Sequence, residues 1–231
     1  MHPTVPETGQ RLAFLPSPKL AGVVRYLHVE RGSGGTVMVP ANPYAMLTFF
    51  LSGGTYTAAD APPIDRPLLC GPLLAPATAS WLPGTTFVTA QLAPEYLPLL
   101  FGVDAAALAR QPLLLSELGL DTGALERQLQ GNADAAVWIA AVEAWLLALL
   151  RRCEGRHALF SLPASALALP TATLAGQCGI SVRQLERRFA ASYGQTIRER
   201  RRMQRYLLAL SSLLRAPVRH GQLTRVAQDA G

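Results

Sequence analysis

Apolar residues recur at strand-like spacing in the first part of the chain. Between residues 20 and 92 the short apolar runs VVRYLHV, TVMVP, MLTFFL and FVTAQL alternate with Gly- and Pro-rich segments such as RGSGGT and DAPPIDRP. Several short strands at this spacing favour a small antiparallel barrel or sandwich. RGSGGT precedes the strand-like TVMVP instead of a helix, so we expect a hairpin loop there and not a phosphate-binding loop.

After Pro94 the spacing becomes helical, and we expect helices over 94–101, 104–110, 121–130 and 133–152. In the last of these, Trp138, Val142, Trp145 and Leu149 share one face, and most other positions are also apolar. Such a helix packs on both sides, either within the chain or with one side against another subunit. Its longest apolar run, 135–150, is shorter than the roughly 20 residues of a membrane span and contains Glu143, so we expect no membrane segment.

These patterns predict an α+β protein of two domains. Residues 1–152 form the first, β-rich to about residue 92 and helical over 94–152, and 153–170 form a linker with a short helix. Residues 171–231 form a second, all-α domain.

Charge separates the same two regions. Residues 1–170 contain ten basic and twelve acidic residues, whereas 171–231 contain eleven arginines and three acids. A basic end of this kind suits a polyanion such as nucleic acid, although a solvated basic surface would look the same. The three cysteines, Cys70, Cys153 and Cys178, fit neither a disulfide framework nor a CxxC metal site, so we expect a cytoplasmic protein.

The most specific motif is TATLAGQCGISVRQLERRF, residues 171–189. Ala175 allows two helices to cross closely, Gly179 supplies the turn four residues later, and Leu185 fills the shared core. Ser181 is a suitable N-cap for the second helix, and Phe189 faces inward with Leu185. This spacing predicts a helix-turn-helix.

On that second helix Arg183 and Arg187 point outward, Gln184 flanks them, and Arg188 lies at the edge. Arginine can read guanine and glutamine can read adenine in the major groove, whereas Arg188 is placed for a phosphate. A helical hairpin with a merely soluble face is the alternative.

A long helix is expected after Gly194, with the apolar stripe Met203, Leu207, Leu210 and Leu214. Its basic residues are Arg198, Arg201, Arg202 and Arg205. The last nine residues, LTRVAQDAG, repeat the Ala-to-Gly spacing of the first motif at Ala227 and Gly231.

Residues 171–231 resemble the DNA-binding domain of AraC/XylS-family transcriptional regulators, in which a long helix joins two helix-turn-helix units. The segment GISVRQLERRFAASYG carries the resemblance, and Arg202, Arg205, Tyr206 and Ala209 match recurring positions of the linking helix. The segments MLTFFL, CGPL and QLAPEYLPLLFGVDAAAL resemble the cupin-like sensor domain of the family more loosely. Ile197 stands where the family commonly has Pro, and the family has a second recognition helix after the position of Gly231.

The resemblance implies a regulator that binds double-stranded DNA, weakened by an incomplete second unit, with an effector pocket inside the barrel. It also implies homodimers, a small-molecule effector and RNA polymerase as partners, no membrane, no cofactor and no enzymatic activity. The residues expected to meet DNA are Ser181, Arg183, Gln184, Arg187, Arg188, Arg202 and Arg205.

Two alternatives stay open. One is an interaction protein that dimerises through its N-terminal domain and does not bind DNA. The other is an enzyme with its active site in the barrel, which is disfavoured because the histidines are scattered along the sequence and no nucleophile–base pair can be recognised. Only His28 lies in the strand region, where we expect a structural role for it. The four histidines are His2, His28, His157 and His220.

Overall fold

The computed structural model describes residues 6–56, 61–108, 111–156 and 160–215. The strands are β1 (Arg11–Phe14), β2 (Val24–Arg31), β3 (Gly35–Val39), β4 (Ala45–Ser52), β5 (Thr55–Tyr56), β6 (Leu68–Cys70), β7 (Ala77–Trp81), β8 (Thr86–Leu92) and β9 (Leu113–Leu114). The α-helices are α1 (Leu97–Phe101), α2 (Ala105–Leu108), α3 (Gly123–Gln130), α4 (Ala135–Arg152), α5 (Thr171–Gln177), α6 (Val182–Tyr193) and α7 (Ile197–Arg215). Short 3-10 helices are η1 (Pro18–Leu20), η2 (Pro94–Tyr96), η3 (Leu115–Leu118) and η4 (Ala164–Ala168).

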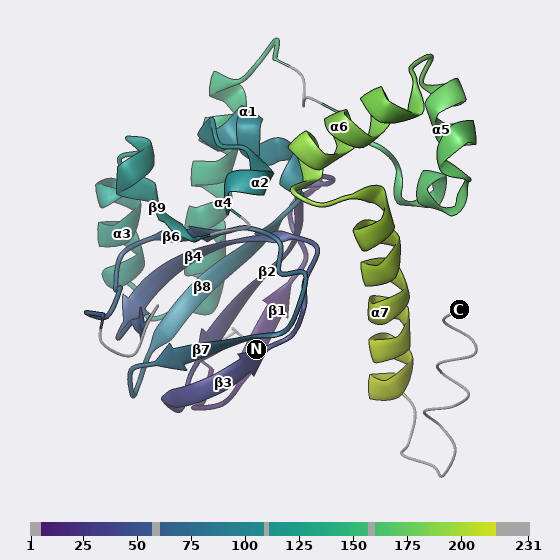
Figure 1. Ribbon diagram of the computed structural model, residues 1–231. Coiled ribbons are helices and arrows are strands. Elements are labelled where there is room, and N and C mark those ends of the chain that lie inside the picture. Colours follow the sequence, from purple (N-terminus) through teal and green to yellow (C-terminus); the bar gives the residue numbers. More distant parts are fainter. Residues whose placement is uncertain (1–5, 57–60, 109–110, 157–159, 216–231) are drawn as a thin grey trace.

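The strands form two antiparallel sheets, and the mixed α+β class is as predicted (Figure 1). One sheet has the order β1-β2-β8-β4-β6-β9, and the other has the order β3-β7-β5. The four apolar runs read as strands became β2, β3, β4 and β8. Of the two expected forms, a barrel or a sandwich, the barrel was wrong: the described strands lie in two separate sheets and form no closed barrel.

The RGSGGT segment is not a hairpin loop, so the expectation of a hairpin at this position was wrong. The strands on either side of it belong to different sheets, because β2 pairs with β1 and β8 while β3 pairs with β7. Gly34 and Gly35 both have φ near +85°, at 85° and 83°, a conformation that side chains resist. The glycines therefore let the chain cross from one sheet to the other.

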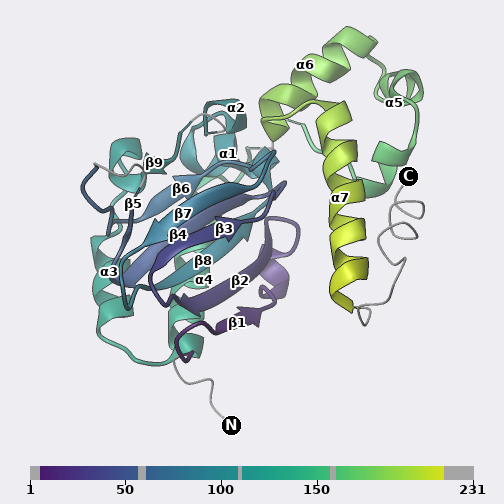
Figure 2. The same ribbon diagram turned by 60° about the horizontal axis from the view of Figure 1, so that its bottom comes forward.

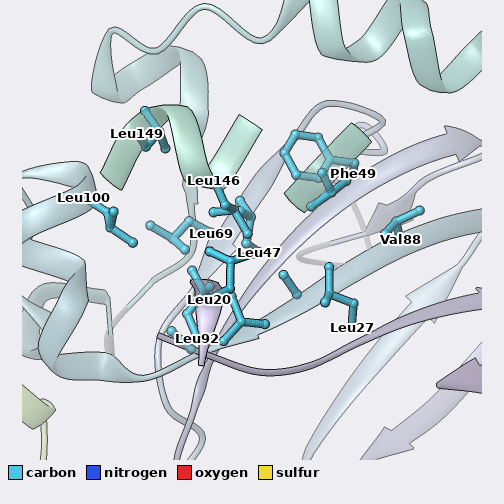
Figure 3. Packing of buried hydrophobic residues seen from close by; sticks show 14 of the residues in the cluster. Leu20, Leu27, Leu47, Phe49, Leu69, Val88, Leu92, Leu100, Leu146 and Leu149 are labelled. Carbon is cyan, nitrogen blue, oxygen red and sulfur yellow. The ribbon is translucent and has the colours of Figure 1, made fainter. Parts of the chain in front are cut away.

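One face of the larger sheet packs against helices and forms the main core (Figure 3). Alternate strand residues point to this face, as the two-residue period of a strand requires. These residues are fully buried, as is Leu146 of α4. Helix α4 contacts both β2 and β8. Those labelled in the figure from the three central strands are Leu27, Leu47, Phe49, Val88 and Leu92.

Helix α4 packs within the chain on the predicted face. Trp138, Val142 and Leu149 are buried, and the ring of Trp145 meets Phe49 edge-on at 5.7 Å. Glu143, the charge inside the apolar run, accepts a hydrogen bond of 2.6 Å from the backbone N–H of Ser17. No helix in the described ranges is long and apolar enough to cross a membrane.

The last three helices have a hydrophobic cluster of their own, distinct from the core under the sheet. Figures 1 and 2 show α5 and α6 at one end of the two-sheet region, while α7 runs alongside it. The expected linker contains η4, and the helices expected over 94–152 are present together with the short strand β9, which the pattern did not predict. The repeat LTRVAQDAG lies outside the described residues.

Candidate functional site

Helices α5 and α6 are joined by a tight turn with the predicted geometry. Gly179 has φ +65°, and the N–H of Ile180 donates to the carbonyl of Ala175 at 3.0 Å. Ala175 is 3% exposed, and Leu185 and Phe189 are fully buried between the two helices. The inward residues of the motif were therefore placed correctly from the sequence.

Ser181 caps α6, as predicted. Its Oγ accepts from the N–H of Gln184 at 3.2 Å, and Gln184 Oε1 accepts from the N–H of Ser181 at 3.0 Å. This reciprocal capping box satisfies donors that the helix start would otherwise leave free. The exposed side chain of Gln184 thus folds back onto the helix start, and reading a base would require it to leave the cap.

Three arginines on the outer side of α6 are free for a ligand. Arg183, Arg187 and Arg188 are exposed, and they make no hydrogen bond or ion pair with any residue that the structure describes. Glu186, also exposed, is the acid that lies among them. The surface therefore offers guanidinium groups whose donors are not used by the fold.

Helix α7 contributes a second set of arginines, and they differ in their surroundings. Arg202 and Arg205, which the sequence analysis expects to meet DNA, are exposed. Arg201 instead donates from Nε to the carbonyl of Leu167 at 2.8 Å and from Nη2 to that of Leu169 at 2.5 Å. Arg201 consequently anchors the linker and is not part of the open basic surface.

A contact between the two regions was not predicted from the sequence. Glu95 in η2 accepts from the hydroxyls of Tyr193 and Ser161, each at 3.3 Å. Burial raises the pKa of Glu95, against the lowering effects of its hydrogen bonds and of Arg200. Tyr193 also accepts from the N–H of Leu162 at 2.8 Å, so this residue of α6 joins both the linker and η2.

Arg200 of α7 makes a further contact with the sheet region. Its Nη1 donates to the carbonyl of Pro43 at 2.8 Å, and its guanidinium lies 5.4 Å from the ring centre of Tyr44 and 5.6 Å from that of Tyr193. At the end of α6, a Cβ on Gly194 would lie 2.6 Å from the carbonyl oxygen of Ala105 in α2. The helices of the basic region are thus docked closely on the sheet region.

A cavity of about 790 Å³ lies between the two sheets. The face of the larger sheet that looks away from α4 forms its floor, and β3, β5 and β7 form much of its opposite wall. Leu207, Leu210 and Ser211 of α7 complete part of the lining. The floor residues are Tyr26, His28, Glu30, Met46, Thr48, Phe50, Leu68, Cys70, Phe87, Thr89 and Gln91.

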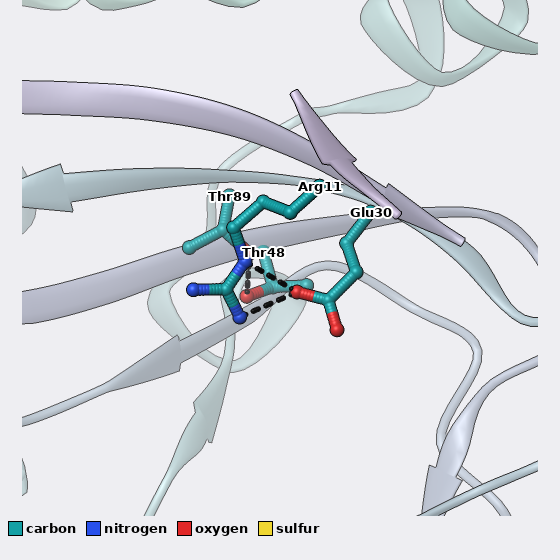
Figure 4. Close-up of polar contacts among 4 residues, drawn as sticks. All are labelled: Arg11, Glu30, Thr48 and Thr89. Carbon is teal, nitrogen blue, oxygen red and sulfur yellow. Dashed lines mark hydrogen bonds and ion pairs between the residues drawn. The ribbon is translucent and has the colours of Figure 1, made fainter. Parts of the chain in front are cut away.

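Two pairs of polar side chains line the cavity (Figure 4). Thr48 and Thr89 on neighbouring strands join their hydroxyls at 2.9 Å, and Arg11 donates from Nε to Glu30 at 2.7 Å. His28 is 5% exposed, and burial together with Arg11 lowers its pKa to about 3. It therefore stays neutral at physiological pH.

Neither a metal site nor a similarity to a known protein assigns a function to this chain. Within the described ranges, no three His, Cys, Asp or Glu side chains are grouped to hold a metal ion. No protein-family model, no curated protein and no solved structure matches the chain.

Proposed function

We propose that this protein is a transcription regulator that binds double-stranded DNA by sequence. In this proposal α5, the turn and α6 make up a helix-turn-helix unit, and α6 enters the major groove. The two-sheet region is a cupin-like domain that binds an effector or forms a homodimer.

The observation that carries the proposal is the asymmetry of α6. Its inner side is fixed by Leu185 and Phe189, both fully buried, while Arg183 and Arg187 on the outer side have no partner among the described residues. A guanidinium bonded to guanine O6 and N7 is a common specific contact in the major groove. A rigid, capped helix that presents such groups is what base reading requires.

A selection from random duplex DNA tests this proposal. The chain should enrich a short motif, and Arg187→Ala should lose preference at one base position, because one bidentate pair is worth about 1–3 kcal/mol. Arg127→Ala, which removes an exposed arginine from α3, is the matched control and should enrich the same motif as the unchanged chain. A folded chain that enriches nothing, or enriches the same motif with Arg187→Ala, would contradict the proposal.

A second candidate is an interaction protein that dimerises and does not bind DNA. It is favoured by the outer side of α4, where Val137 is 36% exposed and Ala140 and Ala144 are exposed in the same row. An apolar row of this spacing offers a surface to a second helix. A monodisperse dimer without DNA affinity would support this candidate and exclude the first.

A further inference from the structure

The lining of the inter-sheet cavity combines one aromatic cluster with few charges. Trp81 of β7 and Phe87 of β8 stack with ring centres 4.7 Å apart, and Phe50 meets both rings at 6.3 Å. Small-molecule sites are mostly apolar, with volumes of about 300–1,000 Å³ and a few polar groups that fix orientation. The cavity has this size and composition.

The charged residues of the lining are Arg11, Arg25 and Glu30, and each has a hydrogen-bond partner in the fold. Arg11 is bonded to Glu30, and Arg25 donates from Nη1 to the hydroxyl of Tyr44 at 2.8 Å. Both arginines are exposed. Deeper in, His28 is neutral, and burial raises the pKa of Cys70 to about 11, so its thiol is also uncharged. A charged ligand group placed beyond the reach of Arg11 and Arg25 would lose its hydration without gaining a counter-charge.

Two buried polar side chains on the cavity floor are available to orient a ligand: Gln91, and His28, whose buried Nδ1 has no hydrogen-bond partner among the described residues. Gln91 of β8 is 8% exposed and lines the cavity, and its amide makes no hydrogen bond with any residue of the described ranges. Because most polar groups inside proteins are hydrogen-bonded, an amide without a protein partner that faces a cavity is available to a ligand. A ligand with one complementary donor or acceptor would satisfy it.

We propose that the inter-sheet cavity binds a neutral organic molecule with a flat, largely apolar body and one hydrogen-bonding group, which pairs with the amide of Gln91. That this molecule acts as an effector rests on the proposed function, whereas its binding to the cavity does not.

Two fluorescent probes with one skeleton test the ligand class. N-phenyl-1-naphthylamine is neutral and has a single N–H, and 8-anilino-1-naphthalenesulfonate adds a sulfonate to the same rings. The purified chain should bind the neutral probe saturably at one site and bind the anionic probe at least about ten-fold more weakly, since the sulfonate would be desolvated without a partner. Equal or tighter binding of the anionic probe would overturn the neutral class.

Three variants locate the site. Ala79 lines the cavity on β7, two residues from Trp81 and therefore on the same face, so Ala79→Phe should abolish binding of the neutral probe. Ala124→Phe makes the same change on the exposed side of α3, outside the cavity lining, and should leave binding unchanged. Gln91→Leu should weaken binding of the neutral probe about five-fold, as expected for the loss of one net hydrogen bond.

Circular dichroism on each variant confirms that it is folded. Binding that survives Ala79→Phe in a folded protein, or that is insensitive to Gln91→Leu, would refute the assigned site. The probes are titrated without DNA. A chain that binds the neutral probe in the cavity but selects no DNA would keep this inference while the proposed function fails.

Discussion

Two glycines in the same backbone conformation give a direct test of the docking between the helical region and the sheet region. Gly179 and Gly194 both have φ +65°, so alanine at either position is strained by about 1–2 kcal/mol. A Cβ on Gly179 would meet nothing within 4 Å, whereas one on Gly194 would lie 2.6 Å from the carbonyl oxygen of Ala105 and 2.7 Å from its carbonyl carbon.

The neighbour of Gly194 is backbone, which cannot rotate away. Overpacking of this kind costs typically about 1–3 kcal/mol. We therefore expect Gly179→Ala to lose about 1–2 kcal/mol of stability and Gly194→Ala to lose about 2–5 kcal/mol, with α6 displaced from α2.

Hydrogen–deuterium exchange read by mass spectrometry separates the two effects. Gly179→Ala should speed exchange around α5 and α6 only, while Gly194→Ala should also speed it in the peptide that contains Ala105 and Leu108. Each 1.4 kcal/mol of lost local stability corresponds to about ten-fold faster exchange. The reasoning is refuted if the two variants change exchange in α2 to the same extent.

Two further predictions concern single side chains. Ser181→Ala removes the N-cap of α6 and should destabilise the helical region by about 1 kcal/mol. Urea denaturation followed at the α6 amides measures this loss, and an unchanged midpoint would rule out the cap as a stabilising contact. In the folded chain the pKa of His28 is lowered from 6.5 to about 3, so between these values the unfolded chain binds a proton that the folded chain does not. The contribution of His28 to the free energy of unfolding is therefore full above pH 6.5, and it falls by up to about 1.4 kcal/mol per pH unit between pH 6.5 and 3. In urea titrations across this range His28→Gln should show a shallower loss of stability than the unchanged chain, and parallel curves would contradict the buried neutral state.

Elements with strong periodicity were predictable because their local pattern agrees with their packing. The runs that became β4 and β8 are apolar and partly β-branched, and the spacing of Ala175, Gly179 and Leu185 specifies a helix, a turn and a buried contact. By contrast β7 has the sequence ATASW, in which apolar and polar residues alternate but two of the three apolar residues are alanine, so the strand signal is weak. Its strand state depends on pairing with β3 and β5, which is a tertiary effect.

The parts of the site that the sequence missed depend on distant partners. Glu95 and Tyr193 are 98 residues apart, and Arg200 and Pro43 are 157 apart, so no local pattern relates them. Gln184 could have been assigned to a capping box, because a Ser with Gln three residues later is its sequence signature. The cavity was expected inside a closed barrel, and it lies instead between two open sheets.

The central claim is that the outer side of α6 reads bases in double-stranded DNA. Fluorescence anisotropy with the selected duplex and a scrambled duplex of equal length, at 50 and 200 mM salt, tests it most directly. The account predicts a clear preference of the unchanged chain for the selected duplex, reduced by about 1–3 kcal/mol in Arg187→Ala. Arg205→Ala should weaken binding to both duplexes equally and should lower the slope of log affinity against log salt by about one. Equal affinity of the folded, unchanged chain for the two duplexes would contradict the claim.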